Sequence, residues 1–146
     1  MKLACADFSW PLLSHERVLT LIGLLEVEGV DLALFGGRSH IRPEVVRADI
    51  PMWAGILTER LARANLELAD FFVQPWTTFD VMAVNHPDPK QQDDARGLFV
   101  DMLELARRLH APGITLLPGV RFGDESWDAS IRRSAEGLKW RVDAAA

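Results

Sequence analysis

The chain has 146 residues, of which 49% are hydrophobic and 25% charged, and its formal net charge at pH 7 is −5. This composition is that of one ordinary globular domain and excludes a mainly disordered chain. The acidic balance also disfavours a nucleic-acid partner, because proteins that bind a polyanion usually carry a basic excess.

The single cysteine, Cys5, excludes an intrachain disulfide scaffold and a zinc or redox site of the CxxC type. No apolar run approaches the roughly 20 residues that span a bilayer. The segment Met1–Asp7 lacks the pattern of a signal peptide. We therefore expect a cytoplasmic protein without a membrane partner, in which Cys5 is a small buried side chain.

Four short apolar runs have the length of strands and end at glycine, proline or polar residues. Such near-continuous apolar runs are typical of strands that are covered on both faces, as in a parallel sheet. The predicted strands are Leu3–Phe8, Asp31–Phe35, Leu66–Gln74 and Ile114–Leu117.

Helical periodicity fills the segments between and after these runs. Gly29 is predicted to end the first helix with a left-handed backbone. Asp88 is predicted to cap the third helix, with Pro89 at its first position and Gln91 completing a capping box. The predicted helices are Ser14–Glu28, Pro51–Asn65, Pro89–His110 and Ser126–Val142.

Strands that alternate with helices predict a parallel sheet with right-handed crossovers. The longest irregular segments, Gly36–Ile50, Pro75–Pro87 and Pro118–Glu125, each follow a strand. Such loops lie at the carboxyl edge of the sheet, where α/β proteins bind ligands. This layout resembles a TIM barrel. The structural alternative is a flavodoxin-like module, but the sequence has no glycine-rich phosphate loop after the first strand to support it.

Candidate binding residues follow the first two predicted strands. Asp7 has the carboxylate of a general base or metal ligand, and Trp10 suits an apolar wall against a sugar ring. The alternatives are a turn cap for Asp7 and a core position for Trp10. Arg38 and His40, with Arg42, suit recognition of a phosphate or carboxylate, and the alternative is a solvated loop.

Further candidates follow the third and fourth strands. The amide of Gln74 could bond a sugar hydroxyl, and the ring of Trp76 could stack on the sugar or pack against the protein. His86 could contact a substrate or a metal, or it could belong to the turn that starts the helix. Gly119 would let a substrate approach the backbone. Arg121 would bind an anion or pair with its acidic neighbours.

The chain resembles the N-terminal half of the sugar phosphate isomerase/epimerase family, the xylose isomerase-like TIM barrels. The resemblance covers essentially the whole chain and implies an α/β fold, the parallel (βα)4 half of a TIM barrel, with residues 1–146 as one truncated domain of the first four βα units. The segments that carry it are Asn85–Pro89, Leu105–Ala111, Ile114–Gly119, Ser126-Trp127 and Ala135–Val142.

This resemblance implies an enzyme that isomerises or epimerises a sugar or sugar-like polyol by proton transfer beside a carbonyl, assisted by a divalent metal (Mn²⁺, Mg²⁺, Co²⁺ or Zn²⁺). In the family the metal ligands lie on later strands, starting with a glutamate on the fifth. That strand would follow Ala146, so neither metal ligands nor catalytic residues are assigned here. We expect this chain alone to bind no metal and to be inactive.

Two other functions stay open. The first is a non-catalytic half-barrel that forms a homodimer through its exposed sheet edges. The second is the lineage of the endonuclease IV-like metal-dependent phosphodiesterases. That lineage is disfavoured by the acidic charge and by the presence of only four histidines, of which His15 and His110 lie near helix ends.

Overall fold

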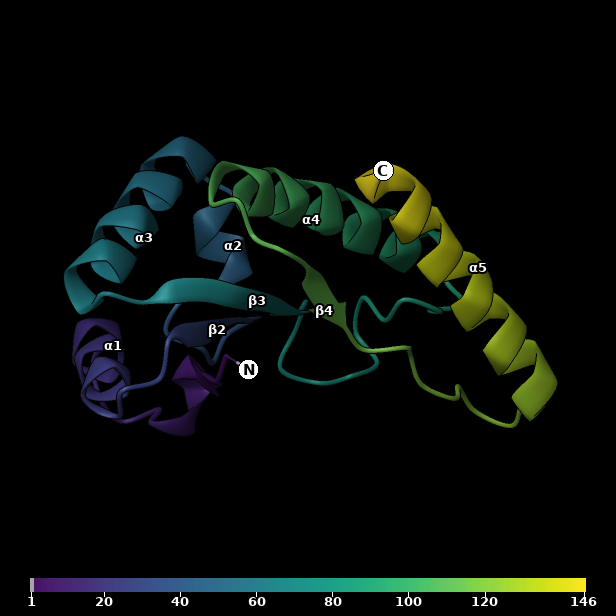
Figure 1. Ribbon diagram of the computed structural model, residues 1–146. Helices are drawn as coiled ribbons and strands as arrows, with labels where there is room; N and C mark the ends of the chain where they lie inside the picture. Colours follow the sequence, from purple (N-terminus) through teal and green to yellow (C-terminus); the bar gives the residue numbers. More distant parts are fainter. Residues whose placement is uncertain (1) are drawn as a thin grey trace.

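The computed structural model describes residues 2–146, which form one parallel sheet of four strands in the order β1-β2-β3-β4. A long helix follows each strand and returns the chain to the start of the next (Figure 1). The α/β class and the four βα units predicted from the sequence are confirmed. The strands are β1 (Ala4–Ala6), β2 (Gly29–Phe35), β3 (Glu67–Gln74) and β4 (Ile114–Leu116), and the helices are α1 (His15–Leu24), α2 (Pro43–Val46), α3 (Ile50–Ala64), α4 (Pro89–Arg108) and α5 (Trp127–Ala145), with a short 3-10 helix η1 (Asp7–Ser9).

The hydrophobic core lies between the helices and one face of the central strands. Alternate side chains of β2 (Val30, Leu32 and Leu34) are fully buried against apolar residues of α1, α3 and α4. The opposite, inner face carries Asp31, Ala33 and Phe35 on β2, in register with Asp70, Phe72 and Gln74 on β3. The period-two alternation of a strand thus divides an apolar outer face from an inner face that also holds polar groups.

The first βα unit differs from its prediction at both ends. β1 stops at Ala6 because Asp7 enters η1, where its Oδ1 accepts the N–H of Ala33 at 2.9 Å. The predicted glycine cap of α1 is wrong: Glu26 takes the left-handed conformation (φ 58°), and Gly29 is the first residue of β2. A Cβ on Gly29 would lie 3.3 Å from the Cβ of Ala4, so this glycine permits close strand pairing.

The start of α4 confirms one half of its predicted capping pattern. Asp88 accepts the N–H of Lys90 at 2.9 Å, and Pro89 is the first helical residue. The predicted capping box is wrong, because Gln91 accepts the N–H of Met82 while the N–H of Asp88 bonds His86 Nδ1. The side chain of Gln91 therefore bonds the long loop after β3 and does not cap the helix.

The β4–α5 end of the molecule is less well covered than the centre. β4 has three residues, none of them buried, and α5 leaves large apolar side chains exposed. Cys5 in β1 is half-buried and packs against the core. None of the helices among residues 2–146 is long and apolar enough to cross a membrane.

Candidate functional site

A pocket of about 350 Å³ opens at the carboxyl ends of β1 and β2, lined by Phe8, Pro11, Phe35, Arg38, Ser39 and His40. Arg38 Nη2 donates to Gln74 Oε1 at 2.5 Å, and its guanidinium lies 5.2 Å from the centre of the Phe35 ring. Within residues 2–146, Arg38 forms no ion pair with a carboxylate. The site thus presents an arginine, a buried amide and an aromatic wall together.

The amide of Gln74 is held in one orientation by the end of β3. Its Nε2 donates to the carbonyl of Trp76 at 2.7 Å, which turns Oε1 toward Arg38. Gly36 closes the same edge by donating its N–H to the carbonyl of Gln74 at 2.9 Å. A Cβ on Gly36 would lie 2.3 Å from the carbonyl oxygen of Pro75, so only glycine fits this crossing.

A buried polar group supports the pocket from below. Asp7 is fully buried, and its Oδ2 lies 3.4 Å from His15 Nε2 without a hydrogen bond. Arg60 Nη1 lies 3.2 Å from His15 Nδ1. Because a guanidinium only donates, His15 Nδ1 accepts, and the ring proton stays on Nε2 facing Asp7. Asp7 therefore holds η1 to β2 and is not open to a ligand.

His40 connects this buried group to the pocket. Its ring centre is 5.7 Å from that of His15, and its Nε2 is buried without a hydrogen-bond partner. Burial lowers the pKa of His40, the charge of Asp7 opposes this shift, and His15 and Arg60 add to it. His40 is therefore a neutral ring in the pocket wall at pH 7.

The residues present do not fit a metal centre. Residues 2–146 contain no group of three or more histidine, cysteine, aspartate or glutamate side chains that could hold a metal ion. Asp7, His15 and His40 lie near one another, with Asp7 Oδ2 3.4 Å from His15 Nε2 and the two histidine ring centres 5.7 Å apart.

His86, Gly119 and Arg121 lie together in the loops after β3 and β4, apart from the Arg38 pocket. His86 Nδ1 accepts the N–H of Asp88, and its ring packs edge-on against Phe122 at 4.7 Å. Arg121 Nε donates to the carbonyl of Glu125 at 2.9 Å. A Cβ on Gly119 would lie 2.3 Å from Asn85 Oδ1, so a side chain of the protein occupies the space beside this glycine. Of the aromatic candidates, Trp10 packs against the core and Trp76 is exposed at the rim.

Asn85, which sequence reasoning missed as a key residue, joins these two loops. It is fully buried, donates from Nδ2 to the carbonyl of Val120 at 2.7 Å and accepts the N–H of Val120 at 3.0 Å. The sequence around Asn85 predicts a turn, but it does not indicate a hydrogen-bond partner as far along the chain as Val120. The aromatic wall was also missed, although Phe35 and Phe72 occupy the inner-face positions that strand alternation specifies.

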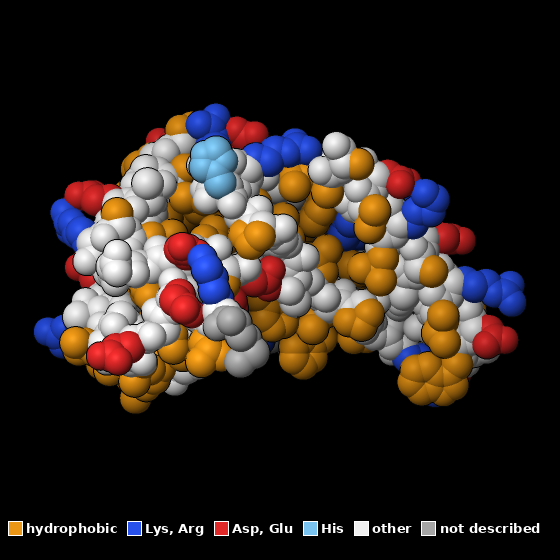
Figure 2. Space-filling view, in the orientation of Figure 1, with side chains coloured by type: hydrophobic (Ala, Val, Ile, Leu, Met, Phe, Trp, Pro, Cys, Tyr) orange, Lys and Arg blue, Asp and Glu red, His pale blue; other side chains and the backbone are white. Residues whose placement is uncertain are grey.

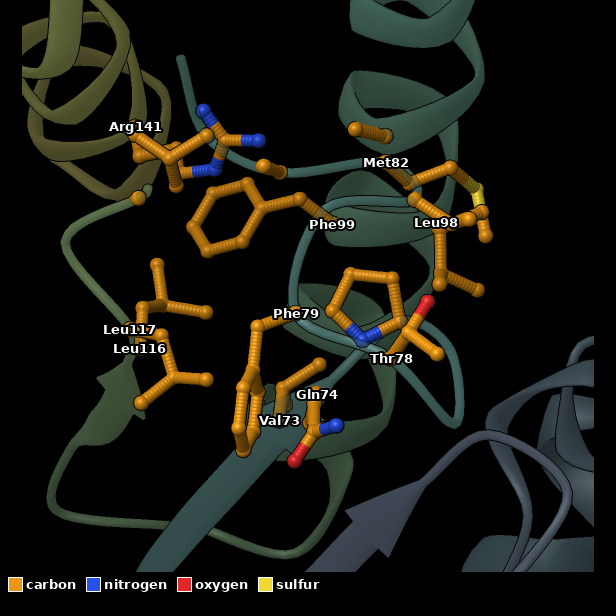
Figure 3. Close-up of a pocket in the computed structure, with 16 residues that line it drawn as sticks. Val73, Gln74, Thr78, Phe79, Met82, Leu98, Phe99, Leu116, Leu117 and Arg141 are labelled. Atoms are coloured by element: carbon orange, nitrogen blue, oxygen red, sulfur yellow. The ribbon is translucent and has the colours of Figure 1, made fainter. Parts of the chain in front are cut away.

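A smaller cavity of about 30 Å³ lies between the loop after β3, α4 and α5 (Figure 3). It has room for little more than one water. Its wall includes the guanidinium of Arg141, which donates to the carbonyl of Gly137 and lies 5.6 Å from the Phe99 ring centre. Burial, with a contribution from Arg96, lowers the pKa of Arg141 to about 10. This cavity is too small for a sugar, so of these two hollows at the carboxyl ends of the strands the Arg38 pocket is the candidate site.

A scan of family models and a search of curated proteins find no match. Solved structures do match. A D-psicose 3-epimerase from Clostridium cellulolyticum H10, determined with D-tagatose, has a TM-score of 0.75 at 13% identity over 99% of this chain and 48% of that chain. A D-psicose 3-epimerase determined in the presence of D-fructose has a TM-score of 0.74 at 11% identity, with the same coverage.

The chain has the fold of part of a TIM barrel. It spans about half the length of the two epimerases that it matches. At these identities the likeness establishes the fold, as expected from the resemblance, and leaves the activity to be argued from the site.

Proposed function

We propose that this chain supplies the sugar-binding part of a TIM-barrel isomerase or epimerase, with residues 1–146 forming four of the eight βα units. Arg38 and Gln74 are the groups that contact the sugar, and Phe8 and Phe35 form the wall on which it rests. The observation that carries this proposal is the 2.5 Å contact between Arg38 and the buried Gln74 at the carboxyl edge of the sheet. TIM-barrel enzymes place their active sites at this edge.

The substrate we propose is a phosphorylated ketose. A guanidinium recognises phosphate through two parallel hydrogen bonds, and Arg38 has no carboxylate partner that would compete for it. The amide of Gln74 keeps a second N–H and a second lone pair for sugar hydroxyls, whereas the Ser39 hydroxyl is bonded to the backbone of Phe35 and Ile41. The likeness in fold to epimerases determined with ketoses supports the same class of ligand.

The proposal assigns binding and orientation of the sugar to residues 2–146 and assigns the proton transfer to none of them. Asp7, a buried carboxylate near the pocket, accepts the N–H of Ala33 through Oδ1, and its Oδ2 faces His15 inside the protein. We therefore expect the isolated chain not to interconvert D-fructose and D-psicose, with or without added Mn²⁺, Mg²⁺ or Co²⁺. Turnover by the purified chain would contradict this expectation.

The binding test is a titration followed by amide chemical shifts in ¹⁵N-labelled protein, with D-fructose 6-phosphate, D-fructose and inorganic phosphate as separate ligands. We expect fructose 6-phosphate to bind most tightly. Arg38→Met should weaken its binding about 10- to 100-fold, the usual effect of losing a hydrogen bond to a charged group.

Arg17→Met, on the exposed side of α1, is the matched control and should leave the affinity unchanged. Equal affinity for inorganic phosphate and fructose 6-phosphate would reduce the site to an anion site. An unchanged affinity in Arg38→Met would refute the assignment of Arg38.

A further inference from the structure

The sheet has two open margins. Within residues 2–146, β1 pairs only with β2 and β4 pairs only with β3, and both edge strands have three residues. Unpaired strand edges present rows of free N–H and C=O groups and promote association unless they are covered. α1 and α5 lie at opposite ends of the sheet, beside these two edges (Figure 1).

The face of α5 beside β4 is an unpacked apolar stripe. Trp127, Ile131, Leu138 and Val142 recur at intervals of four, seven and four residues, which places them on one side of the helix. Ile131 is 60% and Val142 is 68% exposed. Leu138 and Val142 line a groove of about 440 Å³ that β4 also lines through Ile114 and Leu116. We call the four residues the α5 stripe.

The opposite margin is apolar as well. The side of α1 toward α3 is formed by Glu16, Thr20 and Gly23, which lie against Arg60 and Ala64. Because each helical residue turns by 100°, Leu21 and Leu25 lie on the other side of α1, away from α3. In Figure 2 apolar side chains gather at the lower left, near α1, and at the lower right, where α5 begins. We call Leu3, Leu12, Leu21 and Leu25 the β1 margin.

We propose that two copies of this chain close one eight-stranded barrel, in which β4 of each copy pairs with β1 of the other and each α5 stripe covers the other copy's β1 margin. All four strands are parallel and both edge strands are equally long, so this pairing continues the sheet without a change of direction. α1 and α5 both run back along the sheet, so they pack side by side and parallel. The structural neighbours, whose chains are about twice as long, show that the fold admits such a closure.

The area of these surfaces suits a stable dimer. Each copy contributes both margins, whose six exposed side chains offer on the order of 100 Å² each, and the partly buried Leu21 and Leu138 add less. The total approaches the roughly 800 Å² per partner that a standard interface buries, before the strand backbones are counted. The contact is head-to-tail and closes after two copies, which prevents growth into fibres.

The closed dimer would bring two Arg38 pockets to one edge of a shared barrel. This shared mouth rests on the proposed sugar-binding function, whereas the pairing rests only on the open sheet and its apolar margins. Loss of sugar binding by a protein that remains dimeric would refute the function and leave the pairing intact.

Sedimentation equilibrium tests the pairing with two charge variants. We expect the unmodified chain to be a dimer at about 10 µM and Leu25→Glu and Val142→Lys to be monomers, because each places a charge in both of the contacts between the two copies. An equimolar mixture should recover the dimer. In the mixed dimer one of the two contacts is unmodified, and the other pairs the Glu at position 25 with the Lys at position 142.

The matched control is Leu24→Glu, which is 75% exposed on the solvent side of α1 and should stay dimeric. Circular dichroism and thermal unfolding verify that each variant is folded. A monomeric unmodified chain, dimeric single variants or a mixture that stays monomeric would each overturn the proposal.

Disulfide cross-linking provides a second test that needs no charged variant. Cys5 and Leu116 lie on the helix-facing side of their strands, whereas Thr115 faces inward. Leu116→Cys or Ile114→Cys should form a covalent dimer with the native Cys5 under oxidising conditions. Thr115→Cys should form much less of it, and Cys5→Ser should abolish it. Equal cross-linking at positions 114, 115 and 116 would overturn the strand pairing.

Discussion

The centre of the sheet and its β4–α5 end both carry large apolar side chains but reach different degrees of burial. In the centre, Val30, Leu32 and Leu34 of β2 have no exposed surface, because β2 has a strand on each side and helices above it. At the β4–α5 end, Ile131 and Val142 remain mostly exposed. The difference teaches that hydrophobic content specifies what a segment can bury, whereas the number of neighbours decides what it does bury.

The sharpest way to break this comparison is to remove one large side chain from each region. Phe71 in β3 is fully buried, so Phe71→Ala should cost about 3–5 kcal/mol of the free energy of unfolding. Ile131→Ala should cost less than about 0.5 kcal/mol, because its side chain is largely in water. Urea unfolding in the Leu25→Glu background, where pairing is removed, measures both. Similar losses would show that the α5 end is as well packed as the centre.

Sequence reasoning succeeded where local pattern decides the outcome. The helix Pro89–His110 was predicted to within two residues of α4, because Pro89 and the Asp88 cap act over a few positions. The strand Leu3–Phe8 was predicted too long, because the bond from Ala33 to Asp7 that ends β1 spans 26 positions.

The candidate site shows the same division. Arg38, His40 and Gln74 were found because they follow strands, and the structure places Arg38 and His40 on one pocket with Gln74 bonded to Arg38. His86, Gly119 and Arg121 followed the same rule and lie in a separate loop group. The rule identifies the edge of the sheet, whereas side-chain hydrogen bonds between distant loops decide which residues meet.

Asn85 sharpens the comparison, because it joins the loop of the central strand β3 to the loop that leads into α5. Asn85→Ala would leave the N–H of Val120 without its partner, whereas the Val120 carbonyl would keep the hydroxyl of Ser130, and the change should cost about 1–3 kcal/mol. Hydrogen exchange should show the largest loss of protection at the start of α5. Asn65→Gly, which keeps a left-handed residue after α3, is the control and should change the stability little. Uniform loss of protection across β2 and β3 would contradict this role of Asn85.

The smallest expected effect compares the two faces of the central strands. Asp31 lies on the inner face beside Asp70, and burial, followed by the charges of Asp70 and Asp7, raises the pKa of Asp31. A raised pKa means that the folded state favours the protonated carboxyl, so ionised Asp31 destabilises the fold. The contribution of Asp31 to stability is therefore present below the ordinary aspartate pKa near ~4 and is lost as the pH rises through its raised value.

Asp31→Asn should accordingly stabilise the protein at pH 7, by no more than about 0.5 kcal/mol because Asp31 is partly solvated. The advantage should vanish below about pH 4, where the unmodified side chain is protonated as well. Urea unfolding at pH 4 and pH 7 measures this difference, with the exposed Asp124→Asn as a control that should show none. If Asp31→Asn raised the free energy of unfolding equally at both pH values, the inner face would not destabilise the ionised carboxylate of Asp31. Its polar groups would then be as well solvated as those of an open surface, in contrast to the apolar face one residue away.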